Sequence, residues 1–239
     1  MRIALPRWIA HRGGGALAPE NTLAGIRLAA RMGFRAVEFD VMLSADGTPV
    51  LIHDETLERT TNGCGQVSET ADCELFALDA GAGERIPRFI DAARLCRELG
   101  LLANVEIKPA AGHEQATAET VVRMAADVWR HAPEQVLLSS FALDTLVVAR
   151  DLAPDLPRSP LFELVPGDWW RIFEQLQGTA LHCDALGVSD AVLAEAAEQG
   201  VPVLCYTVND AAQAAILLGR GVSGFFTDRL DRFADQARC

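Results

Sequence analysis

The chain has 239 residues, half of them apolar, which suits one α/β barrel or two small domains with a sizeable buried core. Its formal net charge of −12 argues against binding to nucleic acid or anionic membranes, because such surfaces need a concentrated excess of Lys and Arg. We therefore expect a small-molecule partner, no nucleic acid and no stable membrane association.

The N-terminal segment, Met1 to Ala10, carries two arginines and a proline and lacks the apolar core of a signal peptide. No later apolar run is long enough to span a bilayer. The sequence therefore predicts a cytoplasmic protein with a single domain over residues 1–239. It leaves open whether copies of the chain form a homo-oligomer.

Short apolar segments alternate along the chain with Ala- and Leu-rich segments of helical periodicity, a pattern typical of a parallel sheet covered by helices. The predicted strands are Arg7 to Arg12, Ala36 to Leu43, Leu101 to Lys108, Gln135 to Phe141, Arg158 to Leu164, Ala180 to Leu186, Pro202 to Val208 and Gly224 to Thr227. The predicted helices are Thr22 to Met32 with Asn21 as N-cap, Arg88 to Leu99, Ala116 to His131, Asp144 to Asp151, Asp190 to Gln199 and Ala211 to Leu218. Eight strands predict a closed (β/α)8 TIM barrel.

Two segments after the second strand depart from this alternation. Pro49 to Asp54 is predicted to be an extra strand, joined to the second strand through an Asp46-Gly47 turn. Residues 55–84 are polar, contain glycine and are too long for an ordinary connection. We interpret residues 55–84 as a short functional insertion rather than a second domain.

The predicted hairpin has a consequence for the site. If its turn holds two residues, counting back along both strands places Asp40 opposite His53, and cross-strand partners share a face. One extra residue in the turn would break this register.

Three acidic residues are predicted to converge on neighbouring strands. Glu38 and Asp40 are two positions apart, so both carboxylates project from the same face of their strand while Phe39 points away. Glu106 lies on the next strand, and neighbouring strands are only ~4.8 Å apart. A Glu-x-Asp pair alone is more often a solvated face, but the apolar neighbours here indicate buried strands. Three converging carboxylates predict a site for one hard divalent cation, Mg²⁺ or Ca²⁺.

Two of the five histidines, His11 and His53, occupy strand ends, where barrel enzymes keep their catalytic groups. A buried histidine is by itself more often a hydrogen-bonded core residue, but two beside three carboxylates favour catalysis. Arg12 and Lys108 are predicted to bind a phosphate group. The guanidinium of Arg12 is a planar fork, and the ammonium of Lys108 is a compact charge. The role of His182, on the sixth strand, stays open.

Two adjacent tryptophans follow the fifth strand. Trp169 and Trp170 come after a Pro-Gly dipeptide, and we expect them in a loop. They would either cover the alcohol part of a substrate or pack onto the barrel rim.

Five short blocks of the chain match, in this order, the signature of one enzyme family. They are His11-Arg12-Gly13, Pro19-Glu20-Asn21-Thr22, Glu38-Phe39-Asp40-Val41, His53-Asp54 and Asn104-Val105-Glu106-Ile107-Lys108. From about residue 9 to residue 231 the chain resembles the glycerophosphodiester phosphodiesterase family, whose members are (β/α)8 barrels.

This resemblance implies a metal-dependent hydrolase that converts glycerophosphodiesters to glycerol 3-phosphate and an alcohol. It implies that Glu38, Asp40 and Glu106 bind the metal and that His11 and His53 are the acid and base, with His53 favoured as the acid. It implies substrate-binding roles for Arg12, Lys108, Glu20, Asn21 and Tyr206, of which Glu20 and Asn21 would support the site and Tyr206 stands where many relatives have Trp.

Two rival functions remain open from the sequence. A phospholipase-like diesterase acting on lysophospholipids would use the same chemistry and metal site. A catalytically silent barrel that binds a phosphodiester would require one of the five metal or histidine residues to be missing, and all five are present.

Overall fold

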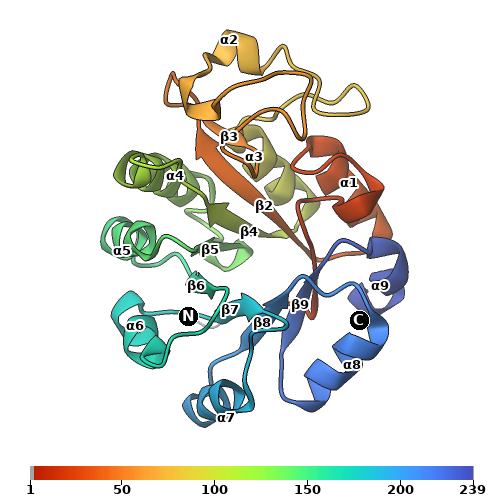
Figure 1. Ribbon diagram of the computed structural model, residues 1–239, viewed down its shortest axis with the longest axis vertical. Helices are drawn as coiled ribbons and strands as arrows, with labels where there is room; N and C mark the ends of the chain where they lie inside the picture. Colours follow the sequence, from red (N-terminus) through yellow and green to blue (C-terminus); the bar gives the residue numbers. More distant parts are fainter. Residues whose placement is uncertain (1–2, 239) are drawn as a thin grey trace.

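The short apolar segments of the sequence form strands that close into a barrel in the computed structural model, which describes residues 3–238 (Figure 1). Met1, Arg2 and Cys239, at the ends of the predicted domain, lie outside the described residues. The barrel strands are all parallel, and β1 closes it by pairing with both β9 and β2. The predicted TIM barrel is confirmed.

Nine strands belong to this sheet within the described residues, and β3 is the one that extends it outside the barrel. The strands are β1 Trp8–Ala10, β2 Ala36–Leu43, β3 Pro49–Leu51, β4 Leu102–Ile107, β5 Val136–Ser140, β6 Arg158–Phe162, β7 Leu181–Asp184, β8 Val203–Tyr206 and β9 Gly224–Thr227. The helices are α1 Leu23–Met32, α2 Asp72–Leu75, α3 Phe89–Leu99, α4 Glu114–Val128, α5 Leu143–Leu152, α6 Trp169–Leu176, α7 Asp190–Gln199, α8 Ala211–Gly219 and α9 Leu230–Ala237. Short 3-10 turns occur at Gly15–Leu17, Val67–Glu69 and Pro133–Gln135.

The two faces of each barrel strand have different partners because side chains alternate along a strand. On β2, Val37, Phe39 and Val41 belong to the main core under the helices, and the ring of Phe39 lies 6.3 Å from that of Phe89 on α3. A smaller apolar cluster fills the barrel interior and includes Ile9, Ala36, Leu102, Ala180, Leu204 and Phe226. On β2 and β4 these apolar residues precede Glu38 and Glu106, so the polar side chains lie toward the carboxyl ends of the strands.

Three helices form where the sequence analysis placed none: α2 in the insertion, α6 and α9. Trp169, expected in a loop, begins α6, is 1% exposed and donates from Nε1 to Glu195 of α7 at 2.6 Å. The alternative in which it packs on the barrel is therefore correct for Trp169. Near the C-terminus, α9 is held by Phe233, whose ring stacks on Trp8 at 3.7 Å. Among the described residues, no helix has the length and apolarity needed to cross a bilayer.

The predicted N-cap of α1 is wrong by one residue. The hydroxyl of Thr22, not the side chain of Asn21, accepts from the N–H of Gly25, at 3.2 Å. A Thr side chain caps a helix as well as most alternatives do, so sequence alone did not separate the two neighbours. The amide of Asn21 is thereby free to contact Asp40.

The β2–β3 hairpin has a different register from the predicted one. Val41 faces Leu51 and Leu43 faces Pro49, and the N–H of Ser44 donates to the carbonyl of Thr48 at 3.0 Å. Its loop therefore holds three residues, not two, with Gly47 at a φ of 76° that favours glycine. The prediction that Asp40 faces His53 is wrong. His53 still reaches the site because β3 ends at Leu51, so the alternation of faces does not extend to it.

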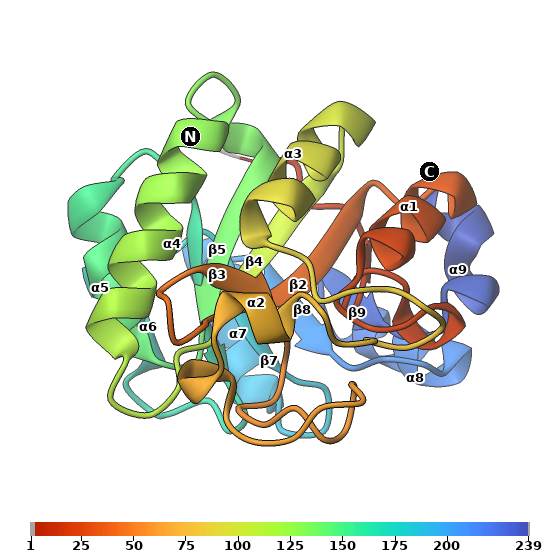
Figure 2. The ribbon, with the colours of Figure 1, turned by 90° about the horizontal axis from the view of Figure 1, so that it is seen from above.

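The predicted insertion, residues 55–84, packs on this hairpin at the top of Figure 1, where it carries α2. Figure 2 shows α2 and its connecting loops beside β3. A separate apolar cluster anchors the insertion and consists of Met42, Val50, Ile52, Leu57, Val67, Leu75, Ala80, Ile86 and Ala110. The insertion is thus fixed next to the carboxyl end of β2.

Candidate active site

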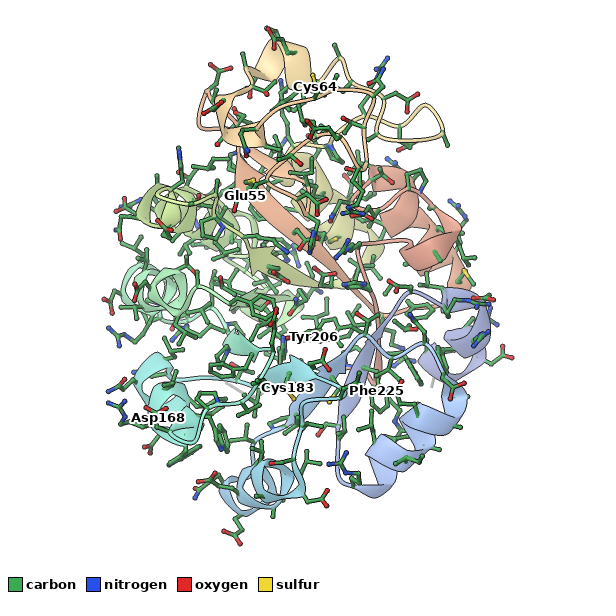
Figure 3. All side chains as sticks on the ribbon, in the orientation of Figure 1. Glu55, Cys64, Asp168, Cys183, Tyr206 and Phe225 are labelled. Atoms are coloured by element: carbon green, nitrogen blue, oxygen red, sulfur yellow. The ribbon has the colours of Figure 1, made fainter. Side chains whose placement is uncertain are left out.

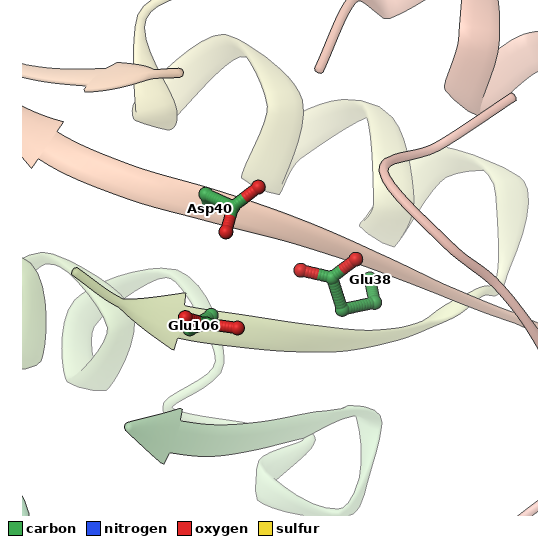
Figure 4. Close-up of side chains that lie close together, drawn as sticks. All are labelled: Glu38, Asp40 and Glu106. Atoms are coloured by element: carbon green, nitrogen blue, oxygen red, sulfur yellow. The ribbon is translucent and has the colours of Figure 1, made fainter. Parts of the chain in front are cut away.

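Three carboxylates meet on neighbouring strands, with Glu38 and Asp40 in the middle of β2 and Glu106 near the carboxyl end of β4 (Figure 4). Asp40 and Glu106 are partners in the parallel ladder, and Glu38 lies two residues before Asp40 on the same face. One oxygen from each of the three lies within 4.8 Å of the others, and all three residues are buried. The Oε1 atoms of Glu38 and Glu106 have no hydrogen-bond partner among the described residues, which leaves lone pairs for a further ligand.

The charges of this cluster are incompletely balanced. Burial raises the pKa of Glu38 well above its usual range, and the charges of Asp40 and Glu106 raise it further. Burial and then Asp40 raise the pKa of Glu106 to about 8. The pKa of Asp40 is lowered instead, because Lys108, His53 and other neighbours outweigh its burial. Three buried carboxylates outnumber the two cations beside them, Arg12 and Lys108, and such an excess of oxygen ligands fits a hard divalent cation, so these residues could hold a metal ion.

His11 lies at the carboxyl end of β1 and is held by a carboxylate. Its Nδ1 is 2.7 Å from Oδ1 of Asp228, and its Nε2 is 3.8 Å from Oε2 of Glu38. Asp228 is held in turn by the side-chain amide of Asn209, which donates to its Oδ2 at 2.9 Å. An acceptor at Nδ1 places the proton there and orients Nε2 toward the carboxylate cluster. The sequence analysis assigned no role to Asp228 or Asn209, although both follow strand ends.

His53 follows β3 and, like His11, has a carboxylate at its Nδ1. Its Nδ1 is 2.6 Å from Oδ1 of Asp54, and its Nε2 contacts the ammonium of Lys108. Burial is the main cause that lowers the pKa of His53, although Asp40 opposes it. Nζ of Lys108 also lies 3.7 Å from Asp40 and 3.7 Å from Glu106. Lys108 therefore joins His53 to the carboxylate cluster.

Arg12 is positioned by both its backbone and its side chain. Its N–H donates to Oε2 of Glu38 at 2.8 Å, in a left-handed conformation with a φ of 49°. Its guanidinium donates to Glu20 at 2.9 Å and lies 3.9 Å from Asp40. Although burial opposes a charge, these three acids raise the pKa of Arg12. Gly15 closes the same loop, and a Cβ there would lie only 2.4 Å from the carbonyl oxygen of Asp228.

Asn21 and Glu20 contact site residues rather than the cavity. The side chain of Asn21 donates to Asp40 at 2.8 Å and accepts from the backbone N–H of Asp40 at 3.0 Å. Glu20 binds Arg12 and also accepts two bonds from Arg59, at 2.8 and 2.9 Å. Both residues therefore support the predicted metal and phosphate ligands.

Arg59, from the insertion, is a site residue to which the sequence analysis assigned no role. It binds Glu20, which holds Arg12, and it also donates from Nε and Nη2 to Asp54, which holds His53. One guanidinium thus connects the supports of a predicted phosphate ligand and a predicted catalytic histidine. The signals in the sequence were the polar run after His53 and the place of Arg59 in the block that resembles the family signature after His53-Asp54.

A cavity of about 440 Å³ opens at this end of the barrel. Tyr206, predicted to contact substrate, lies near the middle of the ring of strands in Figure 3 and lines this cavity. The residues that line it are His11, Arg12, Glu38, Asp40, His53, Asn104, Glu106, Lys108, Phe141, Leu161, Glu163, Tyr206, Thr207 and Phe226. The structure thus brings the predicted metal, histidine and phosphate-binding residues to one cavity.

His182 is separate from this site. It lies on β7 and is fully buried, and neither ring nitrogen has a hydrogen-bond partner among the described residues. Its ring meets that of Phe226 edge-on at 5.1 Å. Burial lowers the pKa of His182 to about 3, so it is a neutral core residue.

Comparison with known proteins assigns the chain to a family. The model of the glycerophosphoryl diester phosphodiesterase family matches residues 11–232. The chain belongs to this family. The family resemblance and the enzyme class predicted from the sequence, a phosphoric diester hydrolase, are thereby confirmed.

Several members of the glycerophosphoryl diester phosphodiesterase family align with most of this chain. A glycerophosphodiester phosphodiesterase of Caldanaerobacter subterraneus subsp. tengcongensis is 31% identical over 227 residues, covering 92% of this chain and 93% of the relative. An Oleispira antarctica phosphodiesterase, solved in complex with the product sn-glycerol-3-phosphate, has a TM-score of 0.90 and 35% identity and covers 98% and 96% of the two chains. A putative glycerophosphoryl diester phosphodiesterase from Silicibacter pomeroyi has a TM-score of 0.85 and 28% identity. The alignment covers 98% of this chain and 95% of that protein.

Proposed function

We propose that this protein hydrolyses glycerophosphodiesters to glycerol 3-phosphate and an alcohol, with Mg²⁺ or Ca²⁺ held by Glu38, Asp40 and Glu106. The observation that carries this proposal is the meeting, in one cavity, of three carboxylates with two carboxylate-supported histidines and two cationic side chains. The Oleispira antarctica relative with bound sn-glycerol-3-phosphate supports the choice of product. The single domain over residues 1–239, its cytoplasmic location and its association state stay predictions.

The roles of the side chains follow from their surroundings. When bound, the cation would offset negative charge on the phosphate as the transition state forms. Arg12 and Lys108 would bind phosphate oxygens, one as a fork and one as a point charge. His11, held through Nδ1 by Asp228, would accept the proton of the nucleophile at Nε2, and His53, held by Asp54, would donate a proton to the leaving alcohol.

The nucleophile follows from the substrate class. A glycerol hydroxyl next to the phosphodiester can attack the phosphorus, which expels the alcohol and leaves a cyclic phosphate. Water then opens this ring to glycerol 3-phosphate. His11 and His53 would exchange the acid and base roles between the two steps, since each ends a step in the protonation state that the other step needs.

Turnover of glycerophosphocholine tests the proposal. We expect glycerol 3-phosphate to appear with Mg²⁺ or Ca²⁺ and not in excess chelator. Glu38→Gln, Asp40→Asn and Glu106→Gln should each abolish this activity, while Glu98→Gln, at an exposed position of α3, should leave it unchanged. Full activity in chelator, or in the three cluster variants, would refute the proposed metal site.

A second candidate function is hydrolysis of lysophospholipids. Two leucines follow β6 and β7 at the carboxyl ends of the strands and are strongly exposed, Leu164 to 78% and Leu186 to 88%. Exposed apolar side chains at this end of the barrel favour contact with an acyl chain. Turnover of lysophosphatidylcholine above that of glycerophosphocholine, lost in the double variant Leu164→Ser and Leu186→Ser, would favour this second function.

A further inference from the structure

The cavity is divided into two chemically different halves. The half formed by β1, β2 and β4 carries the carboxylate cluster, and within the described lining it also carries both cationic side chains, Arg12 and Lys108. The half formed by β5, β6, β8 and β9 is lined by Phe141, Leu161, Glu163, Tyr206, Thr207 and Phe226. It therefore combines aromatic and apolar surface with one acidic side chain and no positive charge.

Two aromatic rings form the wall of this second half. The rings of Phe141 and Tyr206 meet edge-on, with centroids 5.8 Å apart and planes at 80°. The hydroxyl of Tyr206 donates to the carbonyl of Phe162 at 2.9 Å, which fixes the orientation of its ring. Phe141 remains 42% exposed, so part of its ring is available to a ligand. The faces of aromatic rings attract ammonium groups, and most strongly those groups that shed their water easily.

Glu163 adds a negative charge to this wall. It directly follows β6, is exposed, lines the cavity and forms no ion pair among the residues described. Burial is the main cause that raises the pKa of the Tyr206 hydroxyl, and the charges of Asp184 and Glu163 are among those that add to it. Glu163 directly follows Phe162, whose carbonyl accepts from the Tyr206 hydroxyl, so its charge lies on the same side of the cavity as the aromatic rings.

We propose that Glu163, with Phe141 and Tyr206, binds the cationic group of the leaving alcohol and so selects glycerophosphodiesters of amino alcohols such as choline. This inference rests on the proposed function, which places the phosphate between the cluster, Arg12 and Lys108. A substrate held there by its phosphate extends one end into the opposite half of the cavity. In that half the charge and the aromatic rings complement a cation and give an anionic alcohol nothing to pair with.

A pair of substrates that differ only in charge tests the inference. Glycerophosphocholine is compared with the glycerophosphodiester of 3,3-dimethylbutan-1-ol, in which carbon replaces the charged nitrogen. We expect the wild type to favour the choline ester in kcat/KM by roughly fivefold to thirtyfold. Glu163→Gln and Phe141→Leu should each lower this ratio by about twofold or more, because the charge and the aromatic ring both contribute to binding of the cation.

Matched controls and a binding measurement separate the possible outcomes. Glu174→Gln removes the same charge from an exposed position of α6 and should keep the wild-type ratio. Choline alone should bind the wild type more tightly than Glu163→Gln in a calorimetric titration. A wild-type ratio near one, or an unchanged ratio and choline affinity in Glu163→Gln, would overturn the inference.

Two other results have distinct meanings. Equal losses on both substrates in Glu163→Gln would show that the glycerol rather than the alcohol occupies this half, which also overturns the inference. No turnover of either substrate by the metal-loaded wild type would refute the proposed function itself, while choline binding would still report on Glu163 directly.

Discussion

His11 and His53 face the same cavity with the same internal arrangement, in which a carboxylate at Nδ1 leaves Nε2 for chemistry. Their surroundings differ. Nε2 of His11 points toward Glu38, whereas Nε2 of His53 contacts Lys108. This difference is compatible with separate acid and base roles, which depend on when each group must carry its proton.

Leaving-group chemistry separates the two histidines. His53→Ala should lower turnover of glycerophosphocholine by about a hundredfold to ten thousandfold, since an alkoxide leaves badly without a general acid. In a single-turnover measurement the same variant should largely spare the release of nitrophenolate from an analogous glycerophosphodiester, because nitrophenolate is already a weak base and His53 acts as a base only in the later opening of the cyclic phosphate. His11→Ala should impair both substrates, because the nucleophile must lose its proton in each case. A selective loss in His11→Ala, with equal losses in His53→Ala, would reverse the assignment.

His182 should make the protein sensitive to acid. Its pKa is about 3 when folded and about 6.5 when unfolded, so its contribution to stability is complete above pH 6.5 and is lost as pH falls toward 3. When the pH is lowered from 7 to 5, the free energy of unfolding should fall in both proteins. The fall should be about 2 kcal/mol smaller in His182→Leu than in the wild type. Denaturant titrations at the two pH values measure this. Equal losses would mean that the ring is protonated or hydrated in the folded state.

At the scale of elements, the insertion after β3 supplies Arg59 to the site. Arg59 ties Asp54 and Glu20 together, and these two acids hold His53 and Arg12. Its side chain is 46% exposed, so its ion pairs contribute little to stability by themselves. We therefore expect the arrangement to orient His53 and Arg12, which the barrel strands alone do not fix.

Arg59→Gln should lower kcat/KM by about tenfold to a hundredfold with little change in melting temperature, as expected for a residue that orients others. Arg59→Lys should recover only part of the loss, because an ammonium cannot bind two carboxylates with the geometry of a guanidinium. Arg94→Gln, at an exposed position of α3, is the control. Wild-type activity in Arg59→Gln would show that the insertion does not position the site.

At the scale of the whole molecule, the buried carboxylates should couple metal binding to stability. Glu106 has a folded-state pKa of about 8, above its unfolded value, so its contribution to stability is complete below about pH 4.5 and is lost as pH rises through 8. In chelator, the protein should lose at most about 4 kcal/mol between pH 5 and pH 8 through this group. Saturating metal should flatten this dependence, because a bound cation compensates the ionised cluster.

Glu106→Gln provides the matched comparison for this prediction. The amide keeps the shape of the side chain and cannot ionise, so the metal-free variant should melt higher than the wild type at pH 8. Added metal should then change its melting temperature little. Scanning calorimetry with and without chelator measures both effects. Wild-type and Glu106→Gln melting temperatures that change equally with pH in chelator would contradict the assigned shift.

The sequence by itself determined the barrel and the identity of its polar cluster. Both depend on local periodicity, since alternating residues on β2 must place Glu38 and Asp40 on one face. Parallel pairing of neighbouring strands then brings Glu106 beside them. The alternation of strands and helices predicts this pairing, and the signature blocks pointed to the same residues.

The tertiary structure decided the register of the hairpin and the carboxylate supports of His11 and His53. One extra residue in a turn shifts a register, and composition alone does not specify turn length. Asp228 holds His11 across 217 positions of sequence, and Arg59 reaches Glu20 across 39. Such contacts exist only after the barrel closes and the insertion packs on β2 and β3. They depend on how whole elements meet in space, and local sequence patterns carry no information about that.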